Sequence, residues 1–363
     1  MDSLTQFAFG ACVGVAVLGR KVGPRRAALT GGLLGTLPDL DVFLAPADPI
    51  ESFVQHRSWS HSLFVHAAVT PIVGEAVRLG LKPLREHRLV AWAAVFLCLT
   101  THAVLDAITI YGTRLFWPFW SDPIGVGSIF IIDPLYTLPL LVATVWAFCS
   151  RIWSPRYRKA LTVCLGLSLA YLGWTVLAQH MVGNRAATLL AGKGITPERM
   201  IATPTPFNTL LWRVIVIDGD RSLNLYMPVI GGPERTTLYA HDRRLWLAGC
   251  SAGDARIAKV AWFSQGFYRL MLRDGEVSVA DLRMGLTPNY VFRFALGRLK
   301  DNGLVPAPTR RVGERGDIGE DLDWLMANLQ GVPATRPAEA AAKVDPARYA
   351  ALPPPAAGPA GTC

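Results

Sequence analysis

The chain has 363 residues, a formal net charge of +9 and 51% hydrophobic residues, and its length allows one large domain or two ordinary ones. The positive charge does not indicate nucleic-acid binding, because the Lys and Arg residues of the first half stand in short clusters between apolar runs. The six cysteines form no CxxC motif, which argues against a thiolate metal site.

Residues 1–180 are dominated by Leu, Val, Ala, Phe and Trp and predict a membrane domain, an all-α bundle of about six helices. A helix that crosses the hydrocarbon layer needs about 20 apolar residues, which the last four segments reach and the first two do not. The segments are Leu4–Gly19, Ala27–Leu44, His61–Leu81, Leu89–Tyr111, Gly127–Cys149 and Ala160–Gln179.

The charges of the loops predict the orientation of this bundle. Three alternate loops carry eleven Lys and Arg residues, whereas the other two connections carry only Arg57 and Arg114. The positive-inside rule places the basic loops in the cytoplasm, and six crossings then leave both ends of the domain outside. In this arrangement the polar residues of the apolar segments all converge on the outer leaflet: Asp2, Gln6, Asp39, Asp41, His56, His61, His102, Asp106 and Asp133.

From about residue 181 the composition changes to short β-branched and aromatic runs between Gly, Asp and Pro turns, which predicts a small antiparallel β-rich domain over residues 181–331. We expect this domain to be extracytoplasmic, with two short helices at 197–201 and 319–330. The Ala/Pro-rich tail, residues 332–363, is expected to be disordered. The predicted strands are LWRVIVID, SLNLYMPV, TTLYAH, RIAKVAWF, FYRLMLR and NYVFRFAL.

His102 and Asp106 are four residues apart in a predicted helix, so their side chains point in nearly the same direction. The pair suits one divalent ion bound between neighbouring turns, or a carboxylate that orients the imidazole. The alternative is a structural role, in which a buried histidine forms a hydrogen bond with an aspartate one turn later. Within a membrane helix, beside further His and Asp residues, the functional interpretations are favoured.

A second group of polar residues lies between the second and third apolar segments. Asp39 and Asp41 follow a proline where the helix is expected to break, so both carboxylates can turn inward as ligands or as partners of ligands. The stretch HRSWSHS then contributes His56 and His61, with Arg57 suited to bind a phosphate or carboxylate. A polar interfacial loop is the alternative interpretation.

These imidazoles and carboxylates suit Zn²⁺, or Mn²⁺, in a site of one or two ions. The predicted metal ligands are Asp39, Asp41, His56, His61, His102 and Asp106. In hydrolysis Asp41 or Asp106 would take the proton of a metal-bound water, and Arg57 would stabilise the oxyanion. His66, about 140° around its helix from His61, is expected to face elsewhere. Asp133 is a ligand, a partner of one, or a helix cap.

Several motifs together resemble the YdjM/YbcI-like family of bacterial inner-membrane proteins, described as metal-dependent hydrolases. The resemblance implies a multi-helix membrane protein with a metal centre, and no defined substrate. Related members often have THxxxG where this chain has Thr5-Gln6, which leaves Gln6 as a weak neutral ligand or hydrogen-bonding group. The matching stretches are MDSLTQFAFGA, VLGRK, GTLPDLD, HRSWSHS, THAVLDAITIYGT, WPF and IFIIDPLYTLPLL.

The leading hypothesis is therefore a metal-dependent hydrolase of the inner membrane, with its site at the outer leaflet and a lipid-like or phosphoester substrate that arrives laterally from the bilayer. The rival hypothesis is a non-enzymatic metal-binding sensor or accessory protein whose β-rich domain binds a partner. Transport fits poorly, because the polar groups occupy one leaflet and form no path across the membrane. The sequence identifies no protein partner for the β-rich domain.

Overall fold

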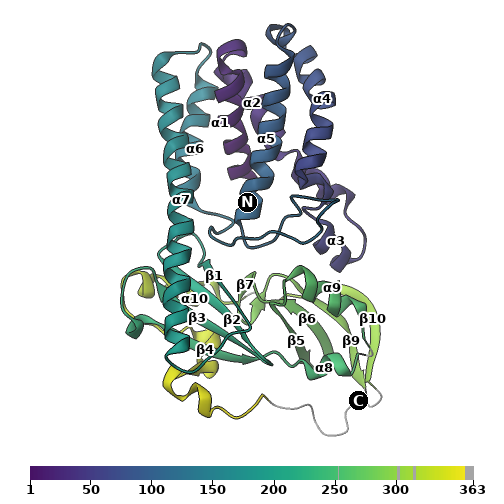
Figure 1. Ribbon diagram of the computed structural model, residues 1–363, viewed down its shortest axis with the longest axis vertical. Coiled ribbons are helices and arrows are strands. Elements are labelled where there is room, and N and C mark those ends of the chain that lie inside the picture. Colours follow the sequence, from purple (N-terminus) through teal and green to yellow (C-terminus); the bar gives the residue numbers. More distant parts are fainter. Residues whose placement is uncertain (252, 301–302, 314–315, 356–363) are drawn as a thin grey trace. The chain divides into compact units, whose positions relative to one another are not determined.

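Apolar helices form the first half of the chain and strands most of the second half, as the hydropathy and strand patterns predict (Figure 1). The computed structural model describes residues 1–251, 253–300, 303–313 and 316–355. By their contacts these residues divide into a helical unit, with residues 1–45, 55–176 and 206–208, and a β-rich unit that contains the others. Each unit has its own hydrophobic core.

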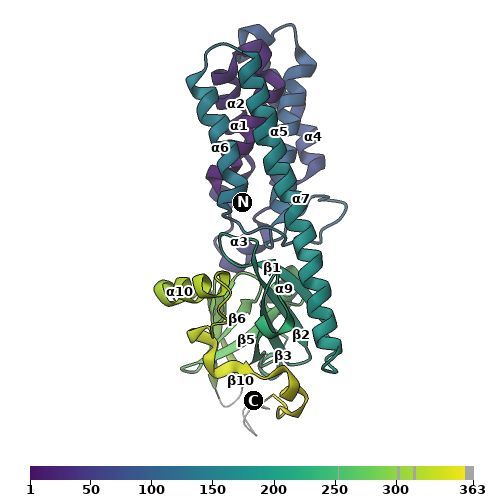
Figure 2. The same ribbon diagram turned by 90° about the vertical axis from the view of Figure 1, so that its left-hand side faces the viewer.

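The helical unit contains the apolar segments as separate helices, of which α1, α2, α4, α5 and α6 run side by side (Figure 1). Helix α7 is continuous (Figure 2) and has 37 residues, of which those up to Val176 belong to this unit. Across residues 1–191 the helices and 3₁₀ helices (η) are α1 Ser3–Val22, α2 Pro24–Thr36, η1 Pro38–Leu44, α3 Pro49–Gln55, η2 Trp59–His61, α4 Leu63–Gly80, η3 Lys82–Leu84, α5 Arg88–Ile108, α6 Pro134–Cys149 and α7 Pro155–Ala191.

Among the described residues, α1, α4, α5 and α7 are each long and apolar enough to cross a membrane. The pair α2 and η1 passes the same test as a span bent by 45°. Pro38 lies at this bend and explains it, because the proline has no backbone N–H to donate and its ring clashes with the preceding turn of a helix. Helix α6 has only 16 residues, since it begins at Pro134 instead of the predicted Gly127, and six crossings remain a prediction.

Helices α1 and α2 approach each other closely through glycines. Gly10 and Gly14 on α1 face Gly31 and Gly35 on α2, and a Cβ atom at Gly10 would lie 2.5 Å from the carbonyl oxygen of Gly31. Small residues spaced by four let membrane helices pack backbone to backbone. This packing fixes the last turn of α2 beside α1 and α5.

The β-rich unit is built from two antiparallel sheets and a short hairpin. Their strand orders are β1-β2-β3-β4-β11, β10-β9-β6-β5 and β7-β8. The strands are β1 Arg199–Pro204, β2 Leu211–Asp218, β3 Arg221–Pro228, β4 Thr237–Asp242, β5 Tyr268–Arg273, β6 Glu276–Asp281, β7 Gly285–Leu286, β8 Asn289–Tyr290, β9 Arg293–Lys300, β10 Gly303–Arg311 and β11 Lys343–Val344.

Two predicted elements of this unit are wrong, and a third agrees with the structure. The run RIAKVAWF is helix α9, Ala255–Phe263, because Asp254 caps its first turn and apolar residues at helical spacing are buried on one face. Residues 199–204 form strand β1 instead of a helix, since all six of them pair with residues of β2. Helix α10, Ile318–Leu329, occupies the second predicted helical position.

The expectation of a disordered tail is wrong for most of its described part. Residues 337–342 and 346–351 form 3₁₀ helices, and Lys343–Val344 is strand β11, paired with β4. Glu339 is buried and accepts hydrogen bonds from Asn224 (2.6 Å) and the Tyr226 hydroxyl (2.7 Å). The prediction considered the Ala/Pro-rich composition and did not consider this single carboxylate, which binds the tail to β3. Residues 356–363 of the predicted tail lie outside the described residues.

The segment between Asp41 and His56 contributes to both units, because residues 46–54 are grouped with the β-rich unit. Within that unit, the Phe53 ring on α3 lies 4.6 Å from the ring of Phe263 and 4.5 Å from that of Phe292, measured between centroids. The chain therefore leaves the helical unit after η1 and returns to it just before His56.

Candidate metal centre

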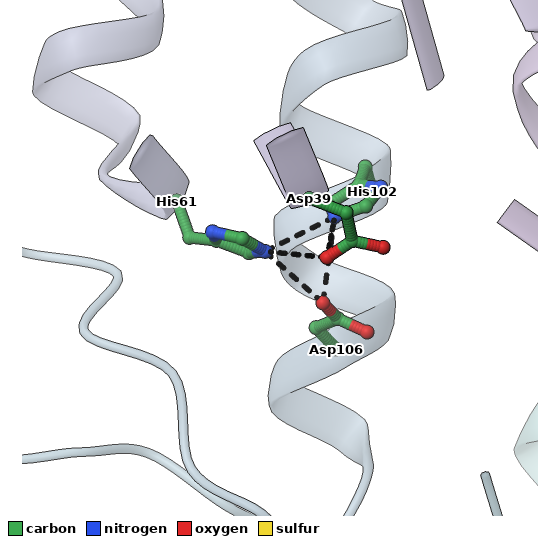
Figure 3. Close-up of side chains that lie close together, drawn as sticks. All are labelled: Asp39, His61, His102 and Asp106. Atoms are coloured by element: carbon green, nitrogen blue, oxygen red, sulfur yellow. Dashed lines mark hydrogen bonds and ion pairs between the residues drawn. The ribbon is translucent and has the colours of Figure 1, made fainter. Parts of the chain in front are cut away.

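Four side chains from three elements meet in the helical unit, and their potential ligand atoms all lie within 4.8 Å of one another (Figure 3). Asp39 comes from η1, His61 from η2, and His102 and Asp106 from successive turns of α5. The His61 and His102 side chains and that of Asp106 are fully buried, whereas that of Asp39 is 22% exposed. We call these four residues the metal group.

The contacts within the metal group are short. The Nε2 atoms of His61 and His102 are 3.1 Å apart, and the Oδ2 atom of Asp106 lies 3.2 and 3.4 Å from them. The Oδ1 atom of Asp39 is 3.5 Å from each of the two nitrogens. Two imidazole nitrogens and two carboxylate oxygens therefore point at one common position (Figure 3).

The hydrogen bond on the other side of the ring fixes the tautomer of His102. Its Nδ1 atom lies 2.5 Å from the carbonyl oxygen of Gly35, which can only accept, so Nδ1 carries the proton. The Nε2 atom of the neutral ring then presents a lone pair to the metal group. The contact between α1 and α2 at Gly10 and Gly35 holds this carbonyl in place.

A chain of hydrogen bonds fixes the tautomer of His61 in the same sense. The Ser60 hydroxyl lies 2.7 Å from Oδ2 of Asp41 and 2.9 Å from Nδ1 of His61. Since the ionised Asp41 only accepts, Ser60 donates its one proton to it and accepts a hydrogen bond from the Nδ1–H of His61. The Nε2 atom of His61 is thereby left with a lone pair.

Two lone pairs and two carboxylate oxygens at these distances repel one another unless a proton or a metal ion lies between them. The Oδ1 atom of Asp39 is buried and has no hydrogen-bond partner among the described residues, which fits an oxygen directed at an ion. Histidines that bind metals usually donate their second N–H to a carbonyl or carboxylate, as His102 does directly and His61 does through Ser60. The donor set of two nitrogens and two oxygens suits zinc.

Positive and neutral donors surround Asp106. Arg57 places its Nε atom 3.1 Å from Oδ2, Gln6 donates to Oδ1 at 3.0 Å, and the amino group of Met1 contacts the same oxygen. Arg57 has a φ of 62°, a conformation that is rare outside glycine and stores backbone strain. The turn it makes directs its own backbone N–H to Asp41 and its guanidinium to Asp106.

Two of the six predicted ligands lie beside the metal group instead of within it. Asp41 and His56 pair with each other, with 2.8 Å between Oδ1 and Nδ1. Asp41 already accepts hydrogen bonds from Ser60 and from the backbone N–H of Arg57, so its oxygens are engaged in orienting His56 and His61. The His56 ring remains close, with its centroid 6.0 Å from that of His61.

Two further polar residues lie outside the metal group. His66 donates a hydrogen bond from Nε2 to the carbonyl oxygen of Ser60 at 2.8 Å, and this contact stabilises the η2 turn. Asp133 caps α6 by accepting hydrogen bonds from the N–H groups of Leu135 and Tyr136, and it also accepts one from the hydroxyl of Tyr171 at 2.9 Å. Asp133 therefore acts as the helix cap that the sequence offered as one alternative.

Sequence reasoning missed two groups that set the histidine tautomers, Ser60 and the carbonyl oxygen of Gly35. The available signal for Ser60 was a hydroxyl residue directly before His61. For Gly35 it was the matching pair of small-residue motifs, Gly10 and Gly14 against Gly31 and Gly35. Every residue has a backbone carbonyl, so residue type does not show which carbonyl accepts the hydrogen bond, and only the packing of the helices identifies it.

Comparison with known proteins identifies a family and one relative. Residues 1–182 match the model of the family described as YdjM inner membrane protein. Over 121 residues the chain is 34% identical to the inner membrane protein YbcI of Escherichia coli (strain K12), a match that covers 33% of this chain and 68% of that relative. No solved structure matches the chain. The family match spans the entire metal group and half of the chain, and this protein therefore belongs to the YdjM inner membrane protein family.

Proposed function

We propose that this protein is a membrane-embedded metal-dependent hydrolase, with its site at the outer leaflet and a lipid-like or phosphoester substrate. The observation that carries the proposal is the convergence of two histidine Nε2 atoms, 3.1 Å apart, with the oxygens of Asp39 and Asp106. These four residues would hold one divalent ion, with zinc favoured over manganese. When bound, such an ion acidifies a water molecule and polarises a phosphoryl or carbonyl oxygen.

The residues around the metal group have roles suited to hydrolysis. Asp41 accepts from Nδ1–H of His56, which leaves the Nε2 atom of His56 free to accept a proton from an attacking water. The His56 side chain is 23% exposed, so it can exchange that proton with solvent. This assignment replaces both carboxylates that the sequence suggested as the base. Asp41 already accepts hydrogen bonds from Ser60 and the backbone of Arg57. Asp106 already contacts Arg57, Gln6 and both histidines of the metal group.

Arg57 supplies positive charge next to the metal group. Its guanidinium is buried beside Asp106, donates to the Thr109 hydroxyl at 3.2 Å and lies over the ring of Tyr111. A guanidinium held in this way stabilises negative charge that develops on a phosphoryl or carbonyl oxygen, and burial strengthens the effect. The preference for an anionic substrate follows from this group.

Metal content tests the proposal directly. The purified full-length protein should hold close to one equivalent of zinc after dialysis, and a His102→Ala variant should lose it. The control is His87→Ala, which removes a half-buried histidine that contacts Lys21 and precedes α5, about four helical turns before His102. Unchanged metal in His102→Ala would refute the proposed ligand set.

A separate variant tests the hydrolytic role against the alternative of a metal-binding sensor. His56→Ala leaves the four proposed ligands in place, so its zinc content should match the wild type while hydrolysis of phosphoester and lipid substrates falls. If the wild type binds zinc but hydrolyses none of these substrates, the sensor or accessory role is supported. Four protein ligands alone would resemble a closed structural zinc site, so catalysis requires that water reach the ion as a further ligand. The partial exposure of Asp39, beside three fully buried ligands, favours the enzyme because it gives water a side from which to approach.

The membrane orientation rests on loop charge. Basic clusters at Arg20–Arg26, Lys82–Arg88 and Arg151–Lys159 are assigned to the cytoplasm, which places the β-rich unit in the periplasm of the inner membrane. A periplasm-dependent phosphatase reporter fused after Gly194, which follows α7, should therefore be active. An inactive phosphatase together with an active cytoplasmic reporter at the same position would reverse the orientation.

A further inference from the structure

A cavity of about 250 Å³ lies in the helical unit next to the metal group. The segment Leu37–Leu44 and the residues Trp59 and Ser60 form one side of it, and helix α4 with Leu99 of α5 forms the other. Nine of its twelve lining residues are apolar. The apolar part of this cavity offers no partners for ordered water, because a buried water needs several polar contacts.

The polar end of the cavity adjoins the metal group. The three polar residues in its lining are Asp41, Ser60 and His66. Ser60 is hydrogen-bonded to His61, and Asp41 to His56, so one hydrogen bond separates the cavity wall from a proposed ligand and from the proposed base. A molecule that filled the cavity with its apolar part would keep its polar part near the metal group.

The rim of the cavity is apolar and accessible. Leu40 is 50%, Leu44 71% and Trp59 46% exposed, although all three are large hydrophobic residues. Helix α4, which forms the facing wall, is a candidate membrane span of which only 17% is buried within the protein. An apolar rim beside a helix that faces hydrocarbon admits a chain from the bilayer and disfavours a water-soluble ligand.

We propose that this cavity binds one hydrocarbon chain of an amphipathic substrate whose hydrolysable headgroup lies at the metal group. The proposal rests on the proposed hydrolase function and names the substrate class, a membrane lipid or other long-chain amphiphile. Val69 and Val73 on α4 and Leu99 on α5 line the cavity, and they set how much of the chain it accepts.

The test uses the full-length protein in mixed micelles of detergent and phosphatidylglycerol that carries a photoreactive diazirine at the end of one acyl chain. Mass spectrometry of the labelled peptides should place the label in residues 37–44 and 59–73. Val69→Trp fills the cavity and should lower this labelling about tenfold, as expected for the loss of roughly two buried methylene groups. Val142→Trp is the control, because Val142 is an exposed apolar residue of α6 that does not line the cavity.

The zinc content of the same samples separates the two proposals. Specific labelling that Val69→Trp abolishes and Val142→Trp preserves, with normal zinc in both variants, supports the chain-binding cavity. Labelling spread evenly over the lipid-facing helices, or unaffected by Val69→Trp, means ordinary boundary lipid and overturns it. If the wild type binds no zinc, the hydrolase proposal fails, and the cavity loses its role as a substrate site even where labelling is specific.

Discussion

Replacing Ser60 by alanine tests whether the tautomer of His61 prepares the metal group. The hydroxyl is the acceptor for Nδ1–H of His61 at 2.9 Å and the donor to Asp41 at 2.7 Å. Without it, the buried Nδ1–H loses its partner, and the ring is free to rotate or to place its proton on Nε2. All four proposed ligands remain, so any loss of affinity comes from orientation and tautomer alone.

The expected loss follows from the general effect of groups that orient metal-binding histidines. Removing such a partner lowers metal affinity about 10- to 100-fold. This range corresponds to about 1.4 to 2.7 kcal/mol. Loss of a whole ligand in His102→Ala should cost considerably more. Zinc affinity is measured on the full-length protein in detergent, by titration against a competing chromophoric chelator.

Two matched variants make the result specific. Ser60→Thr keeps a hydroxyl at the same position and should recover most of the affinity. Thr70→Ala also deletes a buried hydroxyl from this region, but the Thr70 hydroxyl donates to the carbonyl oxygen of His66 and does not contact the metal group. If Ser60→Ala binds zinc as tightly as Thr70→Ala, the reasoning about the His61 tautomer is refuted.

Two further predictions concern packing and acid stability. A Cβ atom at Gly31 would overlap the carbonyl oxygen of Gly10 and lie 2.7 Å from Cα of Gly14. Gly31→Ala should therefore lower the free energy of unfolding by about 1–3 kcal/mol and weaken zinc binding by displacing the Gly35 carbonyl. Gly173→Ala on α7, where a Cβ meets open space, should change neither quantity in thermal unfolding and zinc titration. Burial alone would raise the pKa of Glu339, but the hydrogen bond from His241 and nearby arginines outweigh it and lower that pKa from the ordinary 4.5 to about 2. The stability this carboxylate contributes is complete above pH 4.5, amounts to on the order of 3 kcal/mol, and is lost as the pH falls toward 2. Glu339→Gln should remove this contribution at pH 7 and reduce the loss of stability in acid. The assignment would be contradicted if the free energy of unfolding of the β-rich unit, obtained from hydrogen exchange after correction for the intrinsic exchange rate, were the same at pH 3 and pH 7.

The residue types of the metal group could be predicted because the membrane makes them conspicuous. A carboxylate or imidazole in an apolar helix is costly unless it has a partner or a function. His102 and Asp106, four residues apart on one helix, and the loop residues Asp39 and His61 were identified on this basis, and the structure brings their side chains together. Helical periodicity and loop chemistry are local properties that one chain displays directly.

The division of roles among the polar residues could not be predicted in the same way. Asp41 is only two residues from Asp39, and both carboxylates follow the same proline, yet only Asp39 points into the metal group. The difference comes from Ser60, His56 and the strained turn at Arg57, which together engage Asp41. These contacts join residues 15 to 19 positions apart, which no local pattern specifies.

The β-rich unit shows the same limit of local patterns. The run at 256–263 has the composition of a strand but forms a helix, because Asp254 caps it and one face packs on the core. The tail has the composition of a disordered segment, but Arg336 and Glu339 bury their charges in a network with Asn224 and Tyr226. Composition does not display these contacts, because they join residues 113 and 115 positions apart.

The sequence by itself therefore determined the class of this protein: apolar helices followed by a β-rich unit, with histidine and aspartate residues set into the helices. Composition and periodicity suffice for this, because hydrophobic burial and the cost of charge in an apolar medium act on each segment separately. Only the tertiary structure decided which imidazole nitrogens carry lone pairs and which carboxylates face them. Those properties depend on partners such as Ser60 and the Gly35 carbonyl, which come within hydrogen-bonding distance only when the helices pack.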